Sequence, residues 1–175
     1  MQKILLCLSL LVLSISPVHA HSITKEDVMK AQDAWAAGIV KISKTYIDKG
    51  DYKATAKKHI EDLYAYGKSE VLFKPTLAAD DQFRETFDEA LSYFVGGVVA
   101  EDKGFAIKPW TAARFDGKQQ ITVYDHYAVS MGNYYFTPAD GSGEQKVEFT
   151  FGYIVDENGN LRINLHHSSL PYAPE

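Results

Sequence analysis

The sequence predicts a single α+β domain in which N-terminal helices pack into a curved antiparallel sheet. After residue 20, apolar side chains recur at helical spacings of three and four, and from Gly104 onward the pattern changes to strands separated by glycine turns. Strands and helices do not alternate in that second half, as they would in a parallel α/β fold. Helices followed by a long meander are typical of a sheet wrapped around a helix, which forms a cone with a pocket in its mouth.

The composition indicates one well-packed core. The chain has 175 residues, of which 46% are hydrophobic and 13% aromatic, enough for one domain and too few for two. Its net charge of −5 and the lack of a Lys/Arg-rich run argue against a nucleic-acid partner. One cysteine excludes a disulfide scaffold and a thiolate zinc site.

Residues 1–20 have the pattern of a cleaved secretory signal peptide. Lys3 precedes an apolar run over residues 4–15, and small residues stand at the −3 and −1 positions of a cleavage site after Ala20. An uncleaved membrane anchor is the alternative, but the run is too short to span a bilayer. We therefore expect one soluble domain over residues 21–175, without membrane attachment and in the periplasm or outside the cell.

Capping residues and periodicity predict the elements in order. Three helices are expected, from Thr24 to Lys49, from Asp51 to Gly67 and from Thr86 to Gly96, with a short strand at residues 71–73 before the third. Strands are then expected at residues 105–115, 120–137, 146–156 and 161–169. The turns between them contain Asp-Gly, Gly-Ser-Gly and Asn-Gly, which are typical of hairpins.

Strand parity predicts which side chains of the last strand enter the cone. In residues 161–165 the apolar side chains stand at odd positions and the polar ones at even positions. Because side chains alternate between faces, continuing this register turns His167 and Ser169 inward and His166 and Ser168 outward. The preceding strand has inward apolar residues at Val147, Phe149, Phe151, Tyr153 and Val155. The pattern thus predicts an imidazole and a hydroxyl on an apolar inner wall.

Two other interpretations of the histidines stay open. His167 has the pattern of a core histidine bonded to a backbone carbonyl as much as that of a catalytic group. A zinc site needs convergent imidazoles, whereas the rings of His166 and His167 diverge and His21, His59 and His126 lack ligand spacing. We expect no metal cofactor, although the pattern leaves a divalent ion such as zinc or manganese open.

Further polar candidates lie outside the last strand. Lys74 and Thr76 stand where the chain leaves the short strand, and a solvated lysine and a turn threonine are the alternative. Tyr93 lies one position off the apolar stripe of the third helix, so it is either core or pocket lining. The parity of the long strand around Tyr124 to Tyr135 is ambiguous, and no faces are assigned there.

Four segments of the chain resemble the iota-class carbonic anhydrases. They are LFKPT (72–76), FRETFDEALSYFVG (83–96), EDKGFAIKPW (101–110) and LHHSSLPY (165–172), and the likeness runs from Ala31 to Tyr172. These enzymes are relatives of the calcium/calmodulin-dependent kinase association domain within the NTF2-like fold. An HHSS-x-P ending also occurs in other NTF2-like and SnoaL-like proteins, so its combination with the first two segments is the more specific sign.

The resemblance implies an NTF2-like cone that interconverts carbon dioxide and bicarbonate as a homodimer. Some members of this family work without a metal and others use one, so the resemblance leaves the cofactor open, and the residues below follow the pattern of the metal-free members. It assigns the catalytic Thr, Tyr, His and Ser to Thr76, Tyr93, His167 and Ser169, with substrate contacts from Lys74, Phe73, Ser168 and Phe151. In that scheme the hydroxyls orient water and the histidine carries the proton.

A non-catalytic module that binds a small ligand or oligomerises is the alternative. An isomerase or dehydratase of the same cone needs an inward carboxylate, for which Asp125 and Glu148 are available, and Glu148 is expected to point outward.

Overall fold

The structure is a computed structural model that describes residues 22–174, so the predicted signal peptide, residues 1–20, lies outside the described residues. The elements are α1 (Lys25–Ile47), α2 (Tyr52–Leu63), β1 (Leu72–Lys74), α3 (Phe87–Val95), a 3₁₀ helix (Phe105–Ile107), β2 (Trp110–Phe115), β3 (Gln120–Val123), β4 (Tyr127–Pro138), β5 (Gln145–Val155) and β6 (Leu161–Ser169). No helix in this described range combines the length and the apolar character needed to cross a membrane.

The predicted capping boxes start α1 and α3. The Thr24 hydroxyl accepts from the N–H of Asp27 at 3.1 Å, and the Asp27 carboxylate accepts from the N–H of Thr24 at 3.0 Å. Thr86 and Glu89 repeat this exchange at the start of α3. Each pair satisfies two amides that the first turn leaves free, so local sequence determines where these helices begin.

The second helix ends earlier than predicted, at Leu63. Tyr64 is already extended, with φ −99° and ψ 159°, and forms a parallel bridge with Ile163 of β6. The N–H of Ala65 then donates to the carbonyl of Ile163 at 2.9 Å. This contact with a distant strand draws the chain out of the helix and places Tyr64 against the sheet.

The sheet has the strand order β1-β6-β5-β4-β2, with β3 also paired to β4. All pairs are antiparallel except β1 with β6. The predicted strand over residues 120–137 is in fact a hairpin, β3 and β4, closed where the N–H of Tyr124 donates to the carbonyl of Tyr127 at 2.7 Å. The predicted strand over residues 105–115 begins with the 3₁₀ helix, and only its second half joins the sheet as β2.

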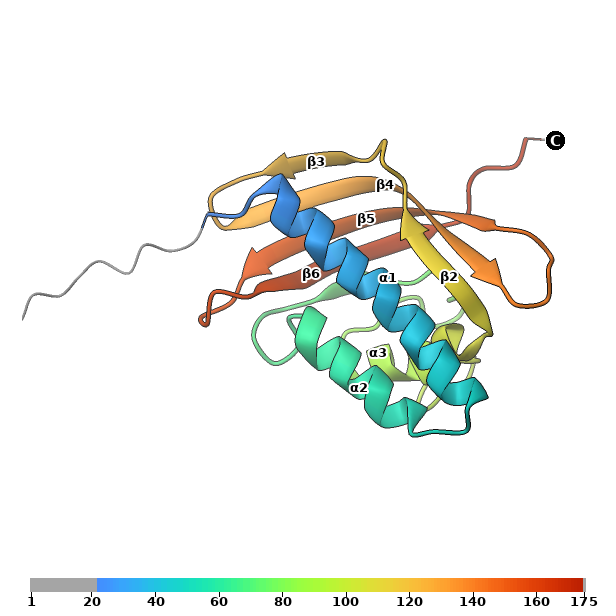
Figure 1. The fold of residues 1–175 in the computed structure, drawn as a ribbon. Helices are drawn as coiled ribbons and strands as arrows, with labels where there is room; N and C mark the ends of the chain where they lie inside the picture. The colour runs from blue at the N-terminus through green and yellow to red at the C-terminus, as the bar shows by residue number, and fades with distance from the viewer. Residues whose placement is uncertain (1–21, 175) are drawn as a thin grey trace, which may run out of the picture.

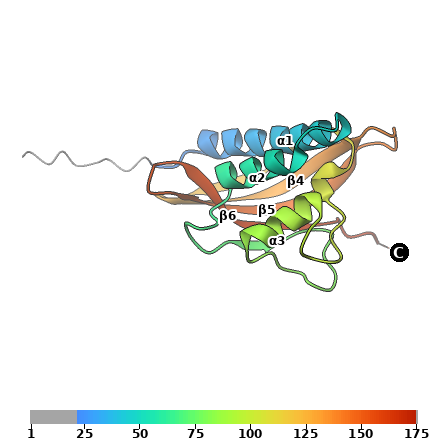
Figure 2. The same cartoon turned by 90° about the horizontal axis from the view of Figure 1, so that it is seen from below.

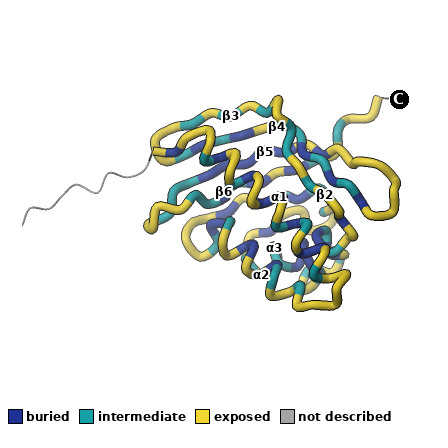
Figure 3. Tube along the Cα trace, in the orientation of Figure 1, coloured by how far each residue is buried: buried dark blue, intermediate teal, exposed yellow. Residues whose placement is uncertain are grey.

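Helix α1 crosses the strands on one side of this curved, open sheet, and α2 lies beside it (Figures 1 and 2). Buried positions gather where the helices meet the sheet, and the loops are exposed (Figure 3). Trp35 of α1 is at the centre of the core, 1% exposed. Its ring makes edge contacts with five aromatic side chains: Phe115, Tyr134, Phe136, Phe151 and His166. The predicted α+β cone is confirmed.

A β-bulge in β6 changes the strand register halfway along. Tyr153 of β5 pairs with Ile163, but the preceding residue, Gly152, pairs with Leu165, so Asn164 is an extra residue in β6. Beyond this point every side chain of β6 is turned to the face opposite to the one that simple alternation predicts. The predicted inward orientation of His167 and Ser169 is therefore wrong, and His166 and Ser168 point inward instead.

Candidate active site

One row of paired residues crosses the inner face of the sheet. Ser130 of β4 pairs with Phe151 of β5, Phe151 with His166 of β6, and His166 with Phe73 of β1. All four are buried, at 3% exposure or less. The His166 ring stacks on Phe73, with centroids 4.6 Å apart and planes at 10°, and meets the ring of Phe151 edge-on at 4.2 Å. Two phenyl rings therefore hold the imidazole in one orientation.

Hydroxyl groups gather next to His166 on the same inner face. The Thr76 hydroxyl donates to that of Ser168 at 2.9 Å, because the parallel pairing of β1 with β6 brings these two segments side by side. The Tyr134 phenol of β4 belongs to the same group: burial raises its pKa, and the hydroxyls of Ser168 and Thr76 lower it by a smaller amount. Tyr93 of α3 meets Phe73 edge-on, with ring centroids 5.7 Å apart; burial raises its pKa, and the backbone of Leu77 and Thr76 lowers it by a smaller amount.

Burial determines the protonation state of this cluster. It raises the pKa of Tyr93 and of Tyr134, so both phenols stay protonated. It lowers the pKa of His166 well below the ordinary value, with smaller contributions from His167 and His59, so this imidazole is neutral near pH 7. The cluster therefore consists of neutral hydrogen-bonding groups enclosed by aromatic rings.

The two nitrogens of His166 have different environments. Nδ1 lies 2.8 Å from the hydroxyl of Tyr64, which accepts a hydrogen bond from the indole N–H of Trp35 at 3.0 Å. Nε2 is buried and has no hydrogen-bond partner among residues 22–174. An unpaired buried polar atom costs free energy, so a small polar ligand that bonded to Nε2 would recover that cost.

The structure brings together five of the predicted site residues and separates three from them. Thr76, Tyr93, Phe73, Phe151 and Ser168 belong to the inner cluster. Lys74, His167 and Ser169 lie on the outer face of the sheet: Lys74 pairs with the exposed His167, and the Ser169 hydroxyl donates to Glu148 at 3.0 Å. The expected inward positions of His167 and Ser169 are corrected accordingly, since the bulge at Asn164 reverses both, and the substrate contact expected of Lys74 is corrected because its strand position places it on the outer face.

Sequence reasoning missed His166, Tyr134 and Tyr64. The sequence did contain a signal for the inward position of His166, because a glycine inside a strand often marks a bulge. A Cβ on Gly152 would lie 2.9 Å from the Cβ of Leu165 and 3.1 Å from the Asn164 side-chain oxygen, so glycine makes room for the bulged strand. For Tyr64 no local pattern was available, since its position depends on the bridge to β6.

The carboxylates give no support to an isomerase or dehydratase site. Asp125 and Glu148, the two strand carboxylates considered, are both exposed. Asp102 is buried, but it is paired with the guanidinium of Arg84 at 2.7 Å. The centre of that guanidinium lies 6.0 Å from the Tyr93 ring centroid, so the ion pair supports the loop next to the cluster.

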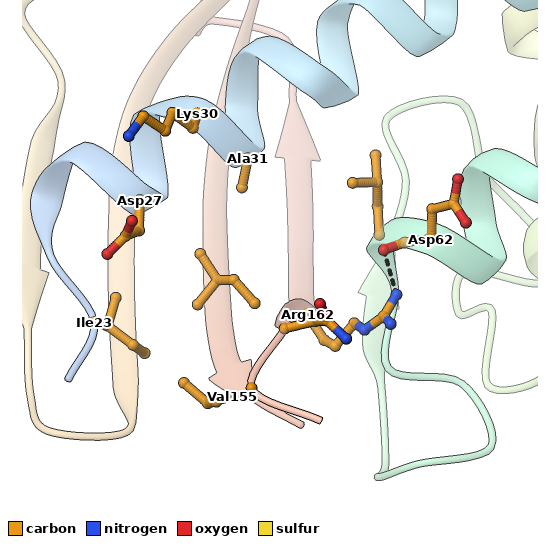
Figure 4. A pocket seen from close by; sticks show the side chains of 11 residues that line it. Ile23, Asp27, Lys30, Ala31, Asp62, Val155 and Arg162 are labelled. Atoms are coloured by element: carbon orange, nitrogen blue, oxygen red, sulfur yellow. Dashed lines mark hydrogen bonds between the residues drawn. The ribbon is translucent and has the colours of Figure 1, made fainter. Parts of the chain in front are cut away.

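Two further features lie outside the cluster. A pocket of about 540 Å³ opens between the start of α1, the end of α2 and the β5–β6 hairpin, and it is lined by none of the predicted site residues (Figure 4). Arg162 is one of its lining residues and donates to the backbone carbonyl of Asp62. Within the described part of the chain, no three His, Cys, Asp or Glu side chains lie together as metal ligands would.

The family of metal-independent carbonic anhydrases matches residues 26–170. The chain belongs to this family. A metal-independent carbonic anhydrase from Nostoc sp. (strain PCC 7120) is 43% identical over 162 residues, which cover 90% of this chain and 78% of the relative. The resemblance to carbonic anhydrases stated from the four segments is confirmed.

Solved structures agree with that assignment. The iota-carbonic anhydrase from a cyanobacterium, complexed with bicarbonate, superposes with a TM-score of 0.84 at 41% identity and covers 91% of this chain and 99% of that one. An NTF2-like superfamily protein from Salmonella enterica gives a TM-score of 0.56 at 15% identity, covering 86% and 93%. An NTF2-like protein of unknown function from Shewanella oneidensis gives 0.53 at 13%, covering 84% and 99%. The last two show the fold alone, which is the predicted NTF2-like one.

Proposed function

We propose that this carbonic anhydrase family member hydrates carbon dioxide reversibly, without a metal, in the cluster formed by Thr76, Tyr93, Tyr134, His166 and Ser168. The observation that carries the proposal is the buried, unpaired Nε2 of His166, whose ring packs against two phenyl rings and which precedes by two residues Ser168, the partner of the Thr76 hydroxyl. The bicarbonate complex of the cyanobacterial relative supports the same substrate here.

The proposed reaction follows from the chemistry of these groups. Phe73 and Phe151 provide a dry wall for apolar carbon dioxide, and the hydroxyls of Thr76 and Ser168 orient a water molecule against it. The water oxygen forms a bond to carbon while one C=O electron pair moves to its oxygen. Fixed donors stabilise the negative charge of the bicarbonate that develops. The proton of the water leaves through the hydroxyls to solvent.

The hydroxyl groups of the cluster are neutral, and this limits the rate of carbon dioxide hydration. The raised pKa values of Tyr93 and Tyr134 exclude a phenolate base near neutral pH. Positioning and donor stabilisation must then supply the acceleration that zinc-bound hydroxide gives other carbonic anhydrases. We expect a real but modest hydration rate.

A hydration assay with and without chelator tests the proposal. Purified protein is followed by stopped-flow acidification after mixing with dissolved carbon dioxide, alongside His166→Ala and, as the matched control, His167→Ala. The expected result is activity unchanged by chelation, lost in His166→Ala and retained in His167→Ala, whose side chain lies on the outer face. Activity that disappears on chelation and returns with zinc or manganese would refute the metal-free mechanism. Inactivity in every state would favour the binding module.

We further propose that two copies associate through the outer face of the sheet. Leu72 and Met131 on that face are 59% and 54% exposed, so apolar area is available there for a second copy to bury. A hollow of about 760 Å³ beside Leu72 includes Phe83, another exposed apolar residue. Sedimentation velocity should give a dimer, and Leu72→Lys should give a monomer with intact helical circular dichroism. A monomeric wild-type protein would refute this association.

The location outside the cytoplasm is likewise a proposal. It is supported by the pattern of residues 1–20. N-terminal sequencing of the protein recovered from the producing cell should begin at His21, and an intact Met1 on the cytoplasmic protein would contradict it.

A further inference from the structure

Three buried side chains form a hydrogen-bonded series that ends at the proposed site. Trp35 of α1, Tyr64 after α2 and His166 of β6 are each 2% exposed or less. The indole nitrogen of Trp35 lies 3.0 Å from the Tyr64 hydroxyl, which lies 2.8 Å from Nδ1 of His166. The series therefore joins α1 to the buried imidazole of β6, which lies two residues before Ser168 on the inner face of the sheet.

The direction of these bonds follows from the donors available. An indole N–H can only donate, so the Tyr64 oxygen accepts from Trp35. The O–H of Tyr64 then needs an acceptor, and Nδ1 of His166 is the one in reach. If Nδ1 carried a proton instead, the Tyr64 oxygen would face two donors and its own buried O–H would lose its partner.

A neutral imidazole with an unprotonated Nδ1 carries its proton on Nε2. A second proton on Nδ1 would remove the acceptor of Tyr64 and place a charge among aromatic rings, which is costly. Rotation of the ring is opposed by Phe73, stacked at 4.6 Å, and by Phe151, edge-on at 4.2 Å. One tautomer in one orientation therefore satisfies all the contacts that are present.

We propose that Trp35 and Tyr64 are positioning residues that hold His166 as the Nε2–H tautomer, so that this ring meets the substrate only as a hydrogen-bond donor. The consequence for the reaction rests on the proposed function, because it assumes that carbon dioxide and bicarbonate bind beside Nε2. There the N–H stabilises the oxygen that becomes negative. His166 does not take the proton of the attacking water, which passes to the hydroxyls.

The tautomer can be measured on the unmodified protein. Histidine labelled with ¹⁵N gives two-bond proton–nitrogen correlations that distinguish the two neutral tautomers, and His166→Gln identifies the signals by their loss. We expect the pattern of a ring protonated at Nε2 and unprotonated at Nδ1, unchanged from neutral to mildly acidic pH. A ring protonated at Nδ1, or one that titrates near pH 6.5, would overturn the proposal.

A pair of tyrosine variants tests the effect on activity. Tyr64→Phe removes the hydroxyl that contacts Nδ1, and Tyr66→Phe, the control, removes a neighbouring phenol oxygen that donates instead to the carbonyl of Arg84 at 2.7 Å. In Tyr64→Phe we expect both tautomers in the spectrum and kcat lower by about tenfold with KM changed less, since one hydrogen-bond partner is lost. Tyr66→Phe should keep the wild-type spectrum and its kcat within about twofold.

The outcomes separate this inference from the proposed function. A protein with the Nε2–H tautomer and no hydration activity would refute the proposed function while supporting the positioning role. An active protein in which Tyr64→Phe leaves the tautomer and kcat unchanged would refute the positioning role alone. Thermal unfolding of each variant shows whether a lower kcat reflects loss of folded protein, and the wild-type spectrum decides the tautomer in either case.

Discussion

Adjacent serines at the end of β6 provide the sharpest test of the site. Ser168 is 3% exposed and accepts from Thr76 at 2.9 Å, whereas the Ser169 hydroxyl faces the other way and donates to Glu148. Ser168→Ala and Ser169→Ala are the same chemical change one residue apart. Any difference in activity or stability between the two variants therefore comes from the face of the sheet on which each serine lies, and not from the chemistry of the substitution.

The magnitudes follow from what each hydroxyl contacts. Ser168→Ala leaves the Thr76 hydroxyl without its acceptor, which should cost about 1–2 kcal/mol of unfolding free energy. Removing one donor from a preorganised site lowers kcat by roughly 10²–10³ in known cases, and we expect about 10–10² here because Tyr134 and Thr76 remain. Ser169→Ala loses only a peripheral bond and should stay within about 0.5 kcal/mol and about twofold in kcat.

Stopped-flow hydration and urea unfolding measure both effects on the same preparations. Adding Thr76→Val completes a double-mutant cycle, in which we expect coupling between Thr76 and Ser168 and none between Thr76 and Ser169. If Ser169→Ala lost activity while Ser168→Ala kept it, the bulge at Asn164 and the inner cluster would both be wrong.

Two predictions concern stability. Burial lowers the pKa of His59 to about 4 and that of His166 well below its ordinary value, so the unfolded chain binds protons that the folded one does not. Stability should be full above about pH 6.5 and fall as the pH drops towards about 4, by about 3 kcal/mol from His59, with a loss in the same direction from His166. His59→Gln should flatten this dependence in urea titrations at stepped pH. Gly38→Ala should destabilise the protein by about 1–3 kcal/mol, because a Cβ there would lie 2.0 Å from Nδ1 of His59. Calorimetry would contradict this if Gly38→Ala were as stable as the wild-type protein, and the paired variant Gly38→Ala with His59→Ala should recover part of the loss.

Local sequence was enough for the starts of the helices and for the side-chain orientation in β5. The capping boxes at Thr24 and Thr86 identify where α1 and α3 begin. Local sequence is enough for this, since each box involves groups only three residues apart. The alternation of apolar residues in β5 correctly predicted that Phe149 and Phe151 point inward, because side chains alternate between faces wherever a strand is regular. Thr76 was predicted as a site residue from its segment, and in the structure its hydroxyl donates to that of Ser168 in the inner cluster.

Tertiary structure decided the other half of the site. Asn164 is bulged out because Gly152, on a different strand, lets the two backbones approach, and alternation within β6 cannot reveal that partner. The bulge exchanges His167 for His166 at the inner wall. Tyr64 reaches His166 only because its backbone bridges Ile163, about a hundred residues further along the chain. Periodicity describes a strand or helix by itself, whereas register and contact between distant segments are set when the sheet and the helices pack together.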